Sequence, residues 1–324
     1  MLEIANGGLY TTVQDYPGRV GYWNVGIPPS GPMDMLALRI ANRLVGNGDR
    51  EAGLEFTVIG PKLRFGKDTI VALTGAKLKG ELNGKSIPWW QALHVEKGSV
   101  LSLGAVEGLG CRAYMAVAGG FDVPDYLGSK STFSKGGFGG YEGRPLTKGD
   151  VLHINGTALE SSRMGKLDSS KVPQYETEWE VGGIPGPHSS PDFFTAADEE
   201  MFYSSTWRVH RNSNRLGYRL EGPRPQFTRK DGGEGGRHPS NIHDCAYAIG
   251  TVNFTGDMPI ILTVDGPSLG GFVSIATIPT AELWKIGQAK PHDHIRFKKM
   301  TVKEAMDGLS RQERLLEEIA PKPN

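Results

Sequence analysis

Residues 238–272 read HPSNIHDCAYAIGTVNFTGDMPIILTVDGPSLGGF, and this stretch decides the fold. The two apolar runs Ala246–Phe254 and Met258–Val264 have the length of β-strands, and Thr255-Gly256-Asp257 between them is typical of a turn. We therefore expect a β-hairpin here. A third short apolar run, Gly271–Ile275, predicts one more strand after the hairpin.

The first seven residues of this stretch carry a concentrated set of polar groups. Two imidazoles, a hydroxyl, a carboxamide and a carboxylate come from His238, Ser240, Asn241, His243 and Asp244. Rigid scaffolds often present functional groups at the ends of buried strands, so this segment is the first candidate site. Metal binding and acid–base chemistry are both open to such residues. Because the spacing His-x4-His-Asp matches no strong metal-ligand pattern, we expect no metal.

The rest of the chain predicts a mainly β protein with a few helices. The chain contains 45 glycines, about twice the average share, which indicates many tight turns between short strands. A β-barrel is the economical interpretation of such a pattern. In the first half, strand patterns occur at Leu54–Ile59, Lys62–Phe65, Thr69–Leu73, Val100–Leu103 and Cys111–Val117.

Three segments have helical patterns. The first runs from about Ser30 to Val45, and Ser30 is its expected N-cap. The second is a short helix that follows Thr195, with Asp198 three residues on. The last helix begins at Thr301 and is expected only to pack against the rest of the chain.

The domain organisation follows from length and from one polar stretch. A chain of 324 residues favours two domains over one. Residues Asn155–Glu176 are polar and weakly periodic, so we place the boundary there. The expected halves are residues 1–160 and 161–324.

Composition excludes several classes of function. Lys plus Arg and Asp plus Glu both total 36, so the net charge is zero and no broad attraction to nucleic acid or to an anionic membrane is implied. Cys111 and Cys245 form no Cys-x-x-Cys motif, which fits a reducing compartment. We find neither a basic-then-apolar leader nor an apolar run of membrane-spanning length. We therefore expect a soluble, cytoplasmic protein that acts on a small ligand.

Further polar segments are weaker candidates. Gln14, Asp15 and Arg19 surround a Pro-Gly turn, and either a binding role or a solvated turn explains them. The glycine-rich segment Gly119–Gly143 has enough aromatic residues to be an ordered loop over a site, and it lacks the Gly-Lys-Ser/Thr of a phosphate-binding loop. The glycines of Asp231–Arg237 are expected to let backbone approach a ligand closely.

Long motifs along the chain resemble a known family. In order, they are GLYTTVQDYPGR, GIPPSGPMDMLALRIANRLVGN, LGSKST, GGFGGYEGRPLTKGD, NSNRLGYRLEGP, GGEGGRHPSNIHD and NFTGDMPIILTVDGPSLGGF. This series resembles the family named allophanate hydrolase subunit 2, and most of all the first half of the carboxyltransferase domain of urea carboxylase and urea amidolyase. HPSNIHD and NFTGD indicate that branch. Arg211 and Cys245 stand where the family pattern has aromatic residues, and His292 stands where it has Gly.

The resemblance implies a fold, a reaction and partners. The expected fold is a cyclophilin-like β-barrel architecture in two halves. The implied reaction transfers a carboxyl group from carboxybiotin to a urea nitrogen and gives allophanate. Biotin would be attached to a separate carrier, because this chain has no Ala-Met-Lys-Met motif, and it has no ATP-binding signature. The implied partners are a sister half named allophanate hydrolase subunit 1, a biotin carrier and a biotin carboxylase.

The resemblance also assigns expected roles to the candidate residues. Asn241 is expected to contact urea, because a carboxamide complements a neutral diamide, whereas Asp would favour cationic guanidine. The other catalytic candidates, His238, His243 and Asp244, would shape the pocket or relay protons. The expected substrate-binding residues are Ser240, Gln14, Asp15, Arg19, Asp265 and Ser268. The alternative is a non-catalytic regulatory or assembly subunit, or a 5-oxoprolinase-subunit-like paralogue that acts on another amide or on guanidine.

Overall fold

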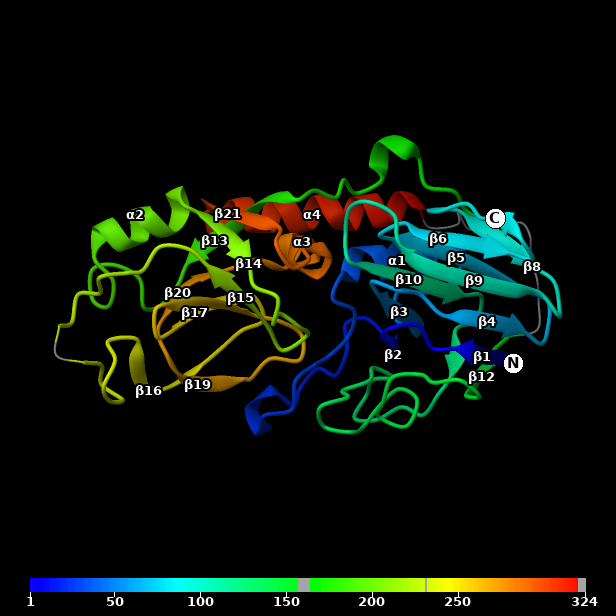
Figure 1. Cartoon of the computed structure of the whole chain (residues 1–324), viewed down its shortest axis with the longest axis horizontal. Helices are drawn as coiled ribbons and strands as arrows, with labels where there is room; N and C mark the ends of the chain where they lie inside the picture. Colours follow the sequence, from blue (N-terminus) through cyan, green and yellow to red (C-terminus); the bar gives the residue numbers. More distant parts are fainter. Residues whose placement is uncertain (157–163, 231, 320–324) are drawn as a thin grey trace. The chain divides into compact units, whose positions relative to one another are not determined.

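The computed structural model describes residues 1–156, 164–230 and 232–319 (Figure 1). Its contacts divide the chain into two compact units. Unit 1 comprises Met1–Val20, Ser30–Tyr175 and Arg311–Asn324, and unit 2 comprises Gly21–Pro29 and Glu176–Ser310. The expected boundary at residues 160/161 lies outside the described residues. Among the described helices, none combines the length and the apolar character that a membrane crossing requires.

Unit 1 is built from two antiparallel sheets. Among the described residues, one sheet has seven strands in the order β11-β12-β1-β4-β9-β6-β7, and the other has five in the order β2-β3-β10-β5-β8. The first contains β1 (Leu2–Asn6), β4 (Lys62–Phe65), β6 (Leu78–Leu82), β7 (Lys85–Ser86), β9 (Val100–Val106), β11 (Phe121–Asp122) and β12 (Val151–Ile154). The second contains β2 (Thr11–Gln14), β3 (Gly53–Thr57), β5 (Thr69–Gly75), β8 (Ala92–Val95) and β10 (Arg112–Val117).

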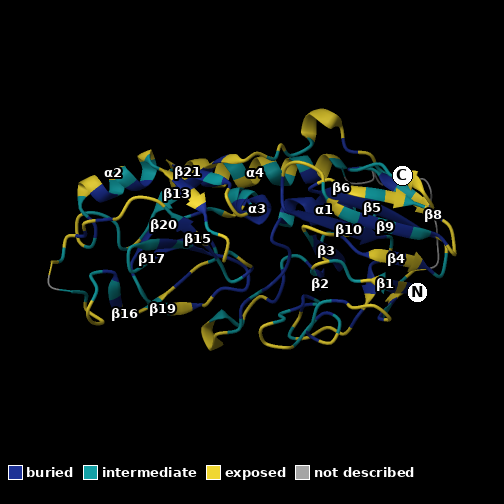
Figure 2. Cartoon of the chain, in the orientation of Figure 1, coloured by how far each residue is buried: buried dark blue, intermediate teal, exposed yellow. Residues whose placement is uncertain are grey.

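The two sheets of unit 1 share one hydrophobic core. Leu2 and Leu63 from the first sheet and Leu54 and Met115 from the second are fully buried in the same cluster. Strands β5 and β10 are buried along their whole length (Figure 2). Their second face is covered by helix α1 (Met35–Leu44). Strands covered on both faces read as continuous apolar runs, which is why the sequence pattern indicates them.

Helix α1 begins later than expected. Its N-cap is Asp34, whose carboxylate accepts a hydrogen bond from the Ala37 N–H at 2.9 Å. The expectation that Ser30 caps this helix is wrong: Ser30 has a left-handed backbone (φ 57°) and lies five residues before the first helical residue. Both residue types cap helices well, so composition alone does not separate them.

Unit 2 contains a closed barrel of seven strands among the described residues, in the order β13-β20-β17-β18-β15-β14-β21. Closure leaves no exposed strand edge. The barrel strands are β13 (Glu178–Pro185), β14 (Thr206–Val209), β15 (Gly217–Glu221), β17 (Thr251–Thr255), β18 (Met258–Leu262), β20 (Ser274–Thr277) and β21 (His294–Lys299). The mainly β fold with few helices is confirmed.

An aromatic cluster fills the barrel of unit 2. The Phe202 and Phe297 rings stack with centroids 4.5 Å apart, and the indole of buried Trp207 donates to the Phe202 carbonyl at 3.0 Å. Phe202 belongs to α2 (Ala196–Ser204), where the expected capping box of Thr195 and Asp198 is present. The remaining α-helices of the described residues are α3 (Leu283–Gln288) and α4 (Val302–Ile319), and α4 begins after Thr301 as expected.

The hairpin expected in residues 238–272 is present, but its first strand is shorter. Strands β17 and β18 pair across the Gly256-Asp257 turn, with Thr255 opposite Met258. The expected single strand from Ala246 to Phe254 is wrong at its start, because the chain turns at Gly250, which has φ 87°. A Cβ at Gly250 would lie 2.4 Å from the Ile278 carbonyl oxygen, so only glycine fits this turn.

Candidate functional site

The polar segment before the hairpin forms a small ribbon in unit 2. Strand β16 (Asn241–Ala246) pairs antiparallel with β19 (Leu269–Phe272), and these strands stand apart from the barrel sheet. Asn241 lies opposite Phe272, while Cys245 lies opposite Gly270, so β16 holds two more residues than β19 over this interval. The bulge interrupts the normal alternation of strand faces, and consecutive His243 and Asp244 are both exposed.

Glycines hold the backbone of this ribbon in place. A Cβ on Gly233 would lie 1.9 Å from the Asn241 carbonyl oxygen, and one on Gly235 would lie 2.4 Å from the Ile242 carbonyl oxygen. The glycines expected to let backbone approach a ligand thus permit the close approach of two segments of this chain. They fix the point at which β16 begins, and with it the position of Asn241.

His238 is held by a serine on one side and a carboxylate on the other. Its Nδ1 lies 2.9 Å from the Ser240 Oγ and accepts a hydrogen bond from the Ser240 N–H at 3.2 Å. The ring proton therefore belongs on Nε2, which lies 3.3 Å from Asp257 Oδ1. The Phe227 ring packs edge-to-face against the imidazole. This arrangement fixes both the tautomer and the orientation of His238.

The Ser240 hydroxyl is part of the framework of the loop. It is fully buried, donates to His238 Nδ1 and accepts the Gly256 N–H at 3.1 Å. Both of its hydrogen-bonding functions are thus used inside the protein. Ser240 thus connects the polar segment to the β17–β18 turn, and its predicted substrate contact stays a prediction.

The Asn241 carboxamide is a polar group of this loop that stays available to a ligand. Asn241 is partly buried, and its backbone N–H donates to the His238 carbonyl at 2.9 Å. Its side chain makes no hydrogen bond to any residue that the structure describes. The structure thus brings His238, Ser240 and Asn241 together, while His243 and Asp244 lie in the exposed bulge further along β16. Within the described ranges, no three His, Cys, Asp or Glu side chains are grouped to hold a metal ion.

Tyr247 follows β16, and its side chain reaches back to Phe272, the residue that lies opposite Asn241. Its hydroxyl donates to the Phe272 carbonyl at 3.0 Å and accepts the Phe272 N–H at 2.7 Å. Burial raises the pKa of the Tyr247 phenol, so the group stays a neutral donor at neutral pH. Ser268 is buried, and its carbonyl accepts the Tyr247 N–H at 2.8 Å, while Trp23 donates its indole N–H to the Tyr247 carbonyl at 2.6 Å.

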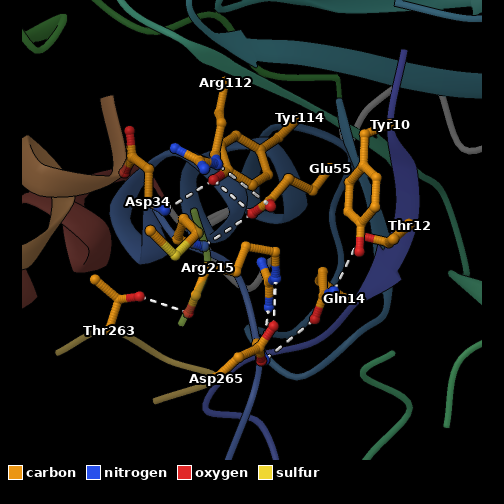
Figure 3. A network of polar contacts seen from close by, with 12 residues as sticks. Tyr10, Thr12, Gln14, Asp34, Glu55, Arg112, Tyr114, Arg215, Thr263 and Asp265 are labelled. Atoms are coloured by element: carbon orange, nitrogen blue, oxygen red, sulfur yellow. Dashed lines mark hydrogen bonds and ion pairs between the residues drawn. The ribbon is translucent and has the colours of Figure 1, made fainter. Parts of the chain in front are cut away.

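Asp265 is engaged in a buried ion pair (Figure 3). Its carboxylate accepts from the Arg215 Nε at 2.8 Å and from a terminal guanidinium nitrogen of the same residue at 3.3 Å. The Thr263 hydroxyl donates to the Arg215 carbonyl, and the Arg215 carbonyl also accepts the Asp265 N–H at 3.0 Å. Asp265 thus fastens the turn after β18 to the loop before β15.

The three candidates of unit 1 organise its glycine-rich loop. The Asp15 carboxylate accepts hydrogen bonds from the Ser129 hydroxyl at 2.5 Å, from the Lys130 N–H at 2.8 Å and from the Ser131 hydroxyl. Buried Gln14 donates to the Thr132 carbonyl at 3.2 Å. These contacts anchor the segment expected to be an ordered loop.

Arg19 is buried against the same loop. Its guanidinium donates to the Tyr126 carbonyl at 3.1 Å and to the Ser131 carbonyl at 2.8 Å, and it lies over the Phe138 ring at 5.0 Å. The charge is therefore directed at backbone oxygens and an aromatic face inside the protein.

A pocket of about 330 Å³ lies beside this loop in unit 1. Asp15, Asp125, Arg50 and Lys130 are the charged residues that line it. Asp125 accepts the Gly128 N–H at 2.8 Å, and Arg50 is exposed. The pocket thus combines two basic and two acidic side chains, and the Lys130 ammonium also donates to the Phe121 carbonyl at 3.4 Å.

Comparison with known proteins identifies the family. The model of the family described as carboxyltransferase domain, subdomain A and B, matches residues 25–299. The chain belongs to this carboxyltransferase-domain family. The resemblance carried by the sequence motifs is thereby confirmed.

Individual members of the carboxyltransferase-domain family show which proteins this chain is similar to. Urea amidolyase from Lachancea kluyveri is 52% identical over 304 residues, which cover 91% of this chain and 17% of that protein. A 5-oxoprolinase subunit from Escherichia coli (strain K12) is 35% identical over 320 residues, which cover 99% of this chain and 98% of that protein. The crystal structure of K. lactis urea amidolyase matches with a TM-score of 0.94 at 45% identity, covering 98% of this chain and 20% of that one. The chain thus spans about a sixth of the urea amidolyases that it matches.

Sequence reasoning misses three residues that the carboxyltransferase-domain structure places at these sites. Asp257 lies in the NFTGD motif and is predicted only as a turn residue, although its carboxylate faces His238. Lys130 lies in the LGSKST motif, and Arg50 follows α1 in a segment without a motif. The motif positions offer a signal for Asp257 and Lys130, whereas only the folded chain reveals Arg50.

Proposed function

We propose that this chain is a carboxyltransferase component of a biotin-dependent urea carboxylase. In this role it transfers a carboxyl group from carboxybiotin to a urea nitrogen and forms allophanate. The observation that carries the proposal is the open, neutral carboxamide of Asn241, in a chain 52% identical to a urea amidolyase over 91% of its length. A sister half, a biotin carrier and a biotin carboxylase would complete the enzyme, and the cytoplasm is its expected location.

Asn241 is the proposed reader of urea. A carboxamide offers one acceptor and two donors, which complement the N–H groups and the carbonyl of a planar neutral diamide. An aspartate at this position would add a negative charge and favour a cationic substrate. The close packing of Gly233 on the Asn241 backbone supports this role, because a recognition group acts best on a rigid base.

The polar neighbours of Asn241 have two proposed roles: some orient the loop, and others transfer protons. Hydrogen bonds join His238, Ser240 and the Gly256 N–H, and the Asp257 carboxylate lies 3.3 Å from His238 Nε2, so these contacts orient the loop. His243 and Asp244 are exposed on the bulge and are the groups able to exchange protons with solvent. We assign to them the removal of the proton that the attacking nitrogen must lose.

Carboxybiotin supplies the activated carboxyl group when it is bound. In the unit 1 pocket, Arg50 and Lys130 would offer cationic donors to its carboxylate, beside the acidic side chains of Asp15 and Asp125. Asp15 would hold Lys130 in place through the Lys130 N–H. In this proposal, Gln14 and Arg19 act through the glycine-rich loop that they anchor, and Asp265 and Ser268 act through the turn and ribbon in which they are buried.

A second candidate function follows from one relative. The 5-oxoprolinase subunit is matched over 98% of its own length, whereas the urea amidolyases are much longer than this chain. A component of a different amide-processing enzyme, or one that only assembles with others, is therefore the competing proposal. Substrate preference separates the two.

Substitution of Asn241 tests the proposal. The Asn241→Asp variant is assayed with urea and with guanidine in the presence of the sister half and a carboxylated biotin carrier. We expect kcat/KM for urea to fall by about tenfold or more, as for loss of one to two kcal/mol of recognition, and guanidine to become the better substrate. Asn212→Asp, at an exposed asparagine of the same unit, is the matched control and should leave the ratio of the two substrates unchanged. Unchanged kinetics on both substrates in Asn241→Asp would remove this residue from the site.

A further inference from the structure

Unit 2 carries a second pocket that the proposed reaction does not use. It has a volume of about 310 Å³ and lies where β14 and β15 end and β21 begins. Its lining consists of Arg208, Val209, His210, Arg211, Glu221 and His292. None of these residues belongs to the loop that holds Asn241.

The charges of this pocket do not cancel. Glu221 forms an ion pair with Arg208, which neutralises one guanidinium. Arg211 is exposed, and no carboxylate of the described residues lies within ion-pair distance of it. The pocket therefore keeps a positive charge, and the Arg211 guanidinium can donate several N–H hydrogen bonds to a ligand.

His210 directs a further donor at the pocket. Its Nδ1 accepts the Asn212 N–H at 3.1 Å, so the ring proton belongs on Nε2. Nε2 lies 3.7 Å from the Glu221 carboxylate, which is beyond hydrogen-bond distance. A ligand oxygen in the pocket would take this donor.

His292 is held at the pocket by an unfavourable backbone conformation. Its φ of 76° lies in the left-handed region, where a side chain is disfavoured and glycine is not. The turn is fixed by the His292 N–H, which donates to the Val209 carbonyl at 2.9 Å, and by buried Asp293, which accepts the Trp179 indole N–H at 3.1 Å. A strained residue that is kept in place by its surroundings is typical of functional sites.

We propose that this pocket binds a small phosphate-type oxyanion. Arg211, His210 and His292 come from two separate segments and line the same pocket. A tetrahedral dianion presents oxygens in several directions and matches such donors, whereas a carboxylate presents two oxygens in one plane. The pocket is also large enough for a phosphate that carries a small substituent.

Calorimetric titration of the chain with inorganic phosphate at constant ionic strength tests this proposal, with pyrophosphate and acetate as comparison ligands. We expect saturable binding of phosphate, tighter or equal binding of pyrophosphate, and weaker binding of acetate. Arg211→Gln should weaken phosphate binding by about tenfold, as for loss of one charge-assisted hydrogen-bonding group. Arg314→Gln, at an exposed arginine of α4 outside the pocket, is the matched control and should bind like the original chain.

His292→Gly separates binding from folding. Glycine relieves the left-handed backbone, so this variant should keep its thermal stability while phosphate binding weakens several-fold. The proposal is overturned if the original chain shows no saturable phosphate binding, if Arg211→Gln binds phosphate as tightly as Arg314→Gln, or if acetate binds as tightly as phosphate.

Discussion

Asp257 is the residue that most directly controls the polar loop of unit 2. Its carboxylate lies 3.3 Å from His238 Nε2, while the other ring nitrogen faces Ser240. A proton on Nδ1 would instead remove the acceptor of the Ser240 N–H, which lies 3.2 Å from this nitrogen. The carboxylate therefore selects one state of the histidine and, through it, the position of Asn241.

Two substitutions of Asp257 distinguish positioning from proton transfer. Asp257→Ala removes the carboxylate that faces His238 Nε2 and should raise KM for urea by about threefold with a smaller change in kcat, because the imidazole loses a part-exposed ion-pair partner. Asp257→Asn keeps a neutral acceptor for Nε2 and should recover most of the loss. Steady-state kinetics across pH is the measurement. If Asp257→Asn is as poor as Asp257→Ala and the pH profile shifts in both, then His238 exchanges protons in the reaction and our positioning role is wrong.

At the scale of elements, the first turn of α2 is connected to the polar loop that precedes β16. Asp198 forms the capping box of α2 and also accepts the Gln226 N–H at 2.7 Å and the Phe227 N–H at 3.1 Å. The Phe227 ring packs against His238. A buried helix cap is thus connected to the candidate site through one aromatic side chain.

The charge of Asp198 makes this support dependent on pH. Burial opposes ionisation, but the hydrogen bonds from Gln226, Thr195 and Phe227 outweigh it and lower the pKa of Asp198. Its contribution to the free energy of unfolding is therefore complete above the pKa of an unfolded aspartate, about 3.9, and is lost as pH falls through the lower pKa of the folded state.

Asp198→Asn should therefore lower the free energy of unfolding by about 1–3 kcal/mol at neutral pH, and the difference from the original chain should shrink near pH 2. Urea denaturation at both pH values measures it. Asp192→Asn, at an exposed aspartate before α2, should have little effect at either pH. A destabilisation by Asp198→Asn that stays constant across pH would contradict the assigned charge effect.

The elements show where sequence reasoning succeeds and where it fails. The β17–β18 hairpin and the capping box of α2 depend on residues within a few positions of one another, and the sequence predicts both. The predicted cap of α1 is wrong because Ser30 and Asp34 are both good caps, and the choice depends on the left-handed backbone at Ser30. The split of the strand expected at Ala246–Phe254 depends on Gly250 packing against the Ile278 carbonyl, a contact across 28 residues that no local pattern contains.

At the scale of the whole molecule, the long motifs predict the family. They do not predict which residues belong to which of the two units. Residues Gly21–Pro29 belong to unit 2 although their sequence neighbours belong to unit 1. The contact behind this assignment includes the hydrogen bond from the Trp23 indole to the Tyr247 carbonyl. Motifs likewise nominate Gln14, Asp15 and Arg19 without revealing that their side chains are directed at the glycine-rich loop.

The length of the matched relatives bears on whether the chain acts alone. It spans about a sixth of the urea amidolyases that it matches, so the proposed reaction draws on parts outside it. We expect binding of the sister half to be necessary for turnover, and Asn241 to affect turnover without affecting assembly.

The most direct test is allophanate formation in a reconstituted system. This chain, the sister half, a biotin carrier and a biotin carboxylase are combined with ATP, labelled bicarbonate and urea, and labelled allophanate is measured with and without this chain. We expect allophanate only in the complete mixture, formed about tenfold or more slowly when Asn241→Asp replaces the original chain. Formation of the complex without any allophanate would contradict the carboxyltransferase role and favour an assembly role.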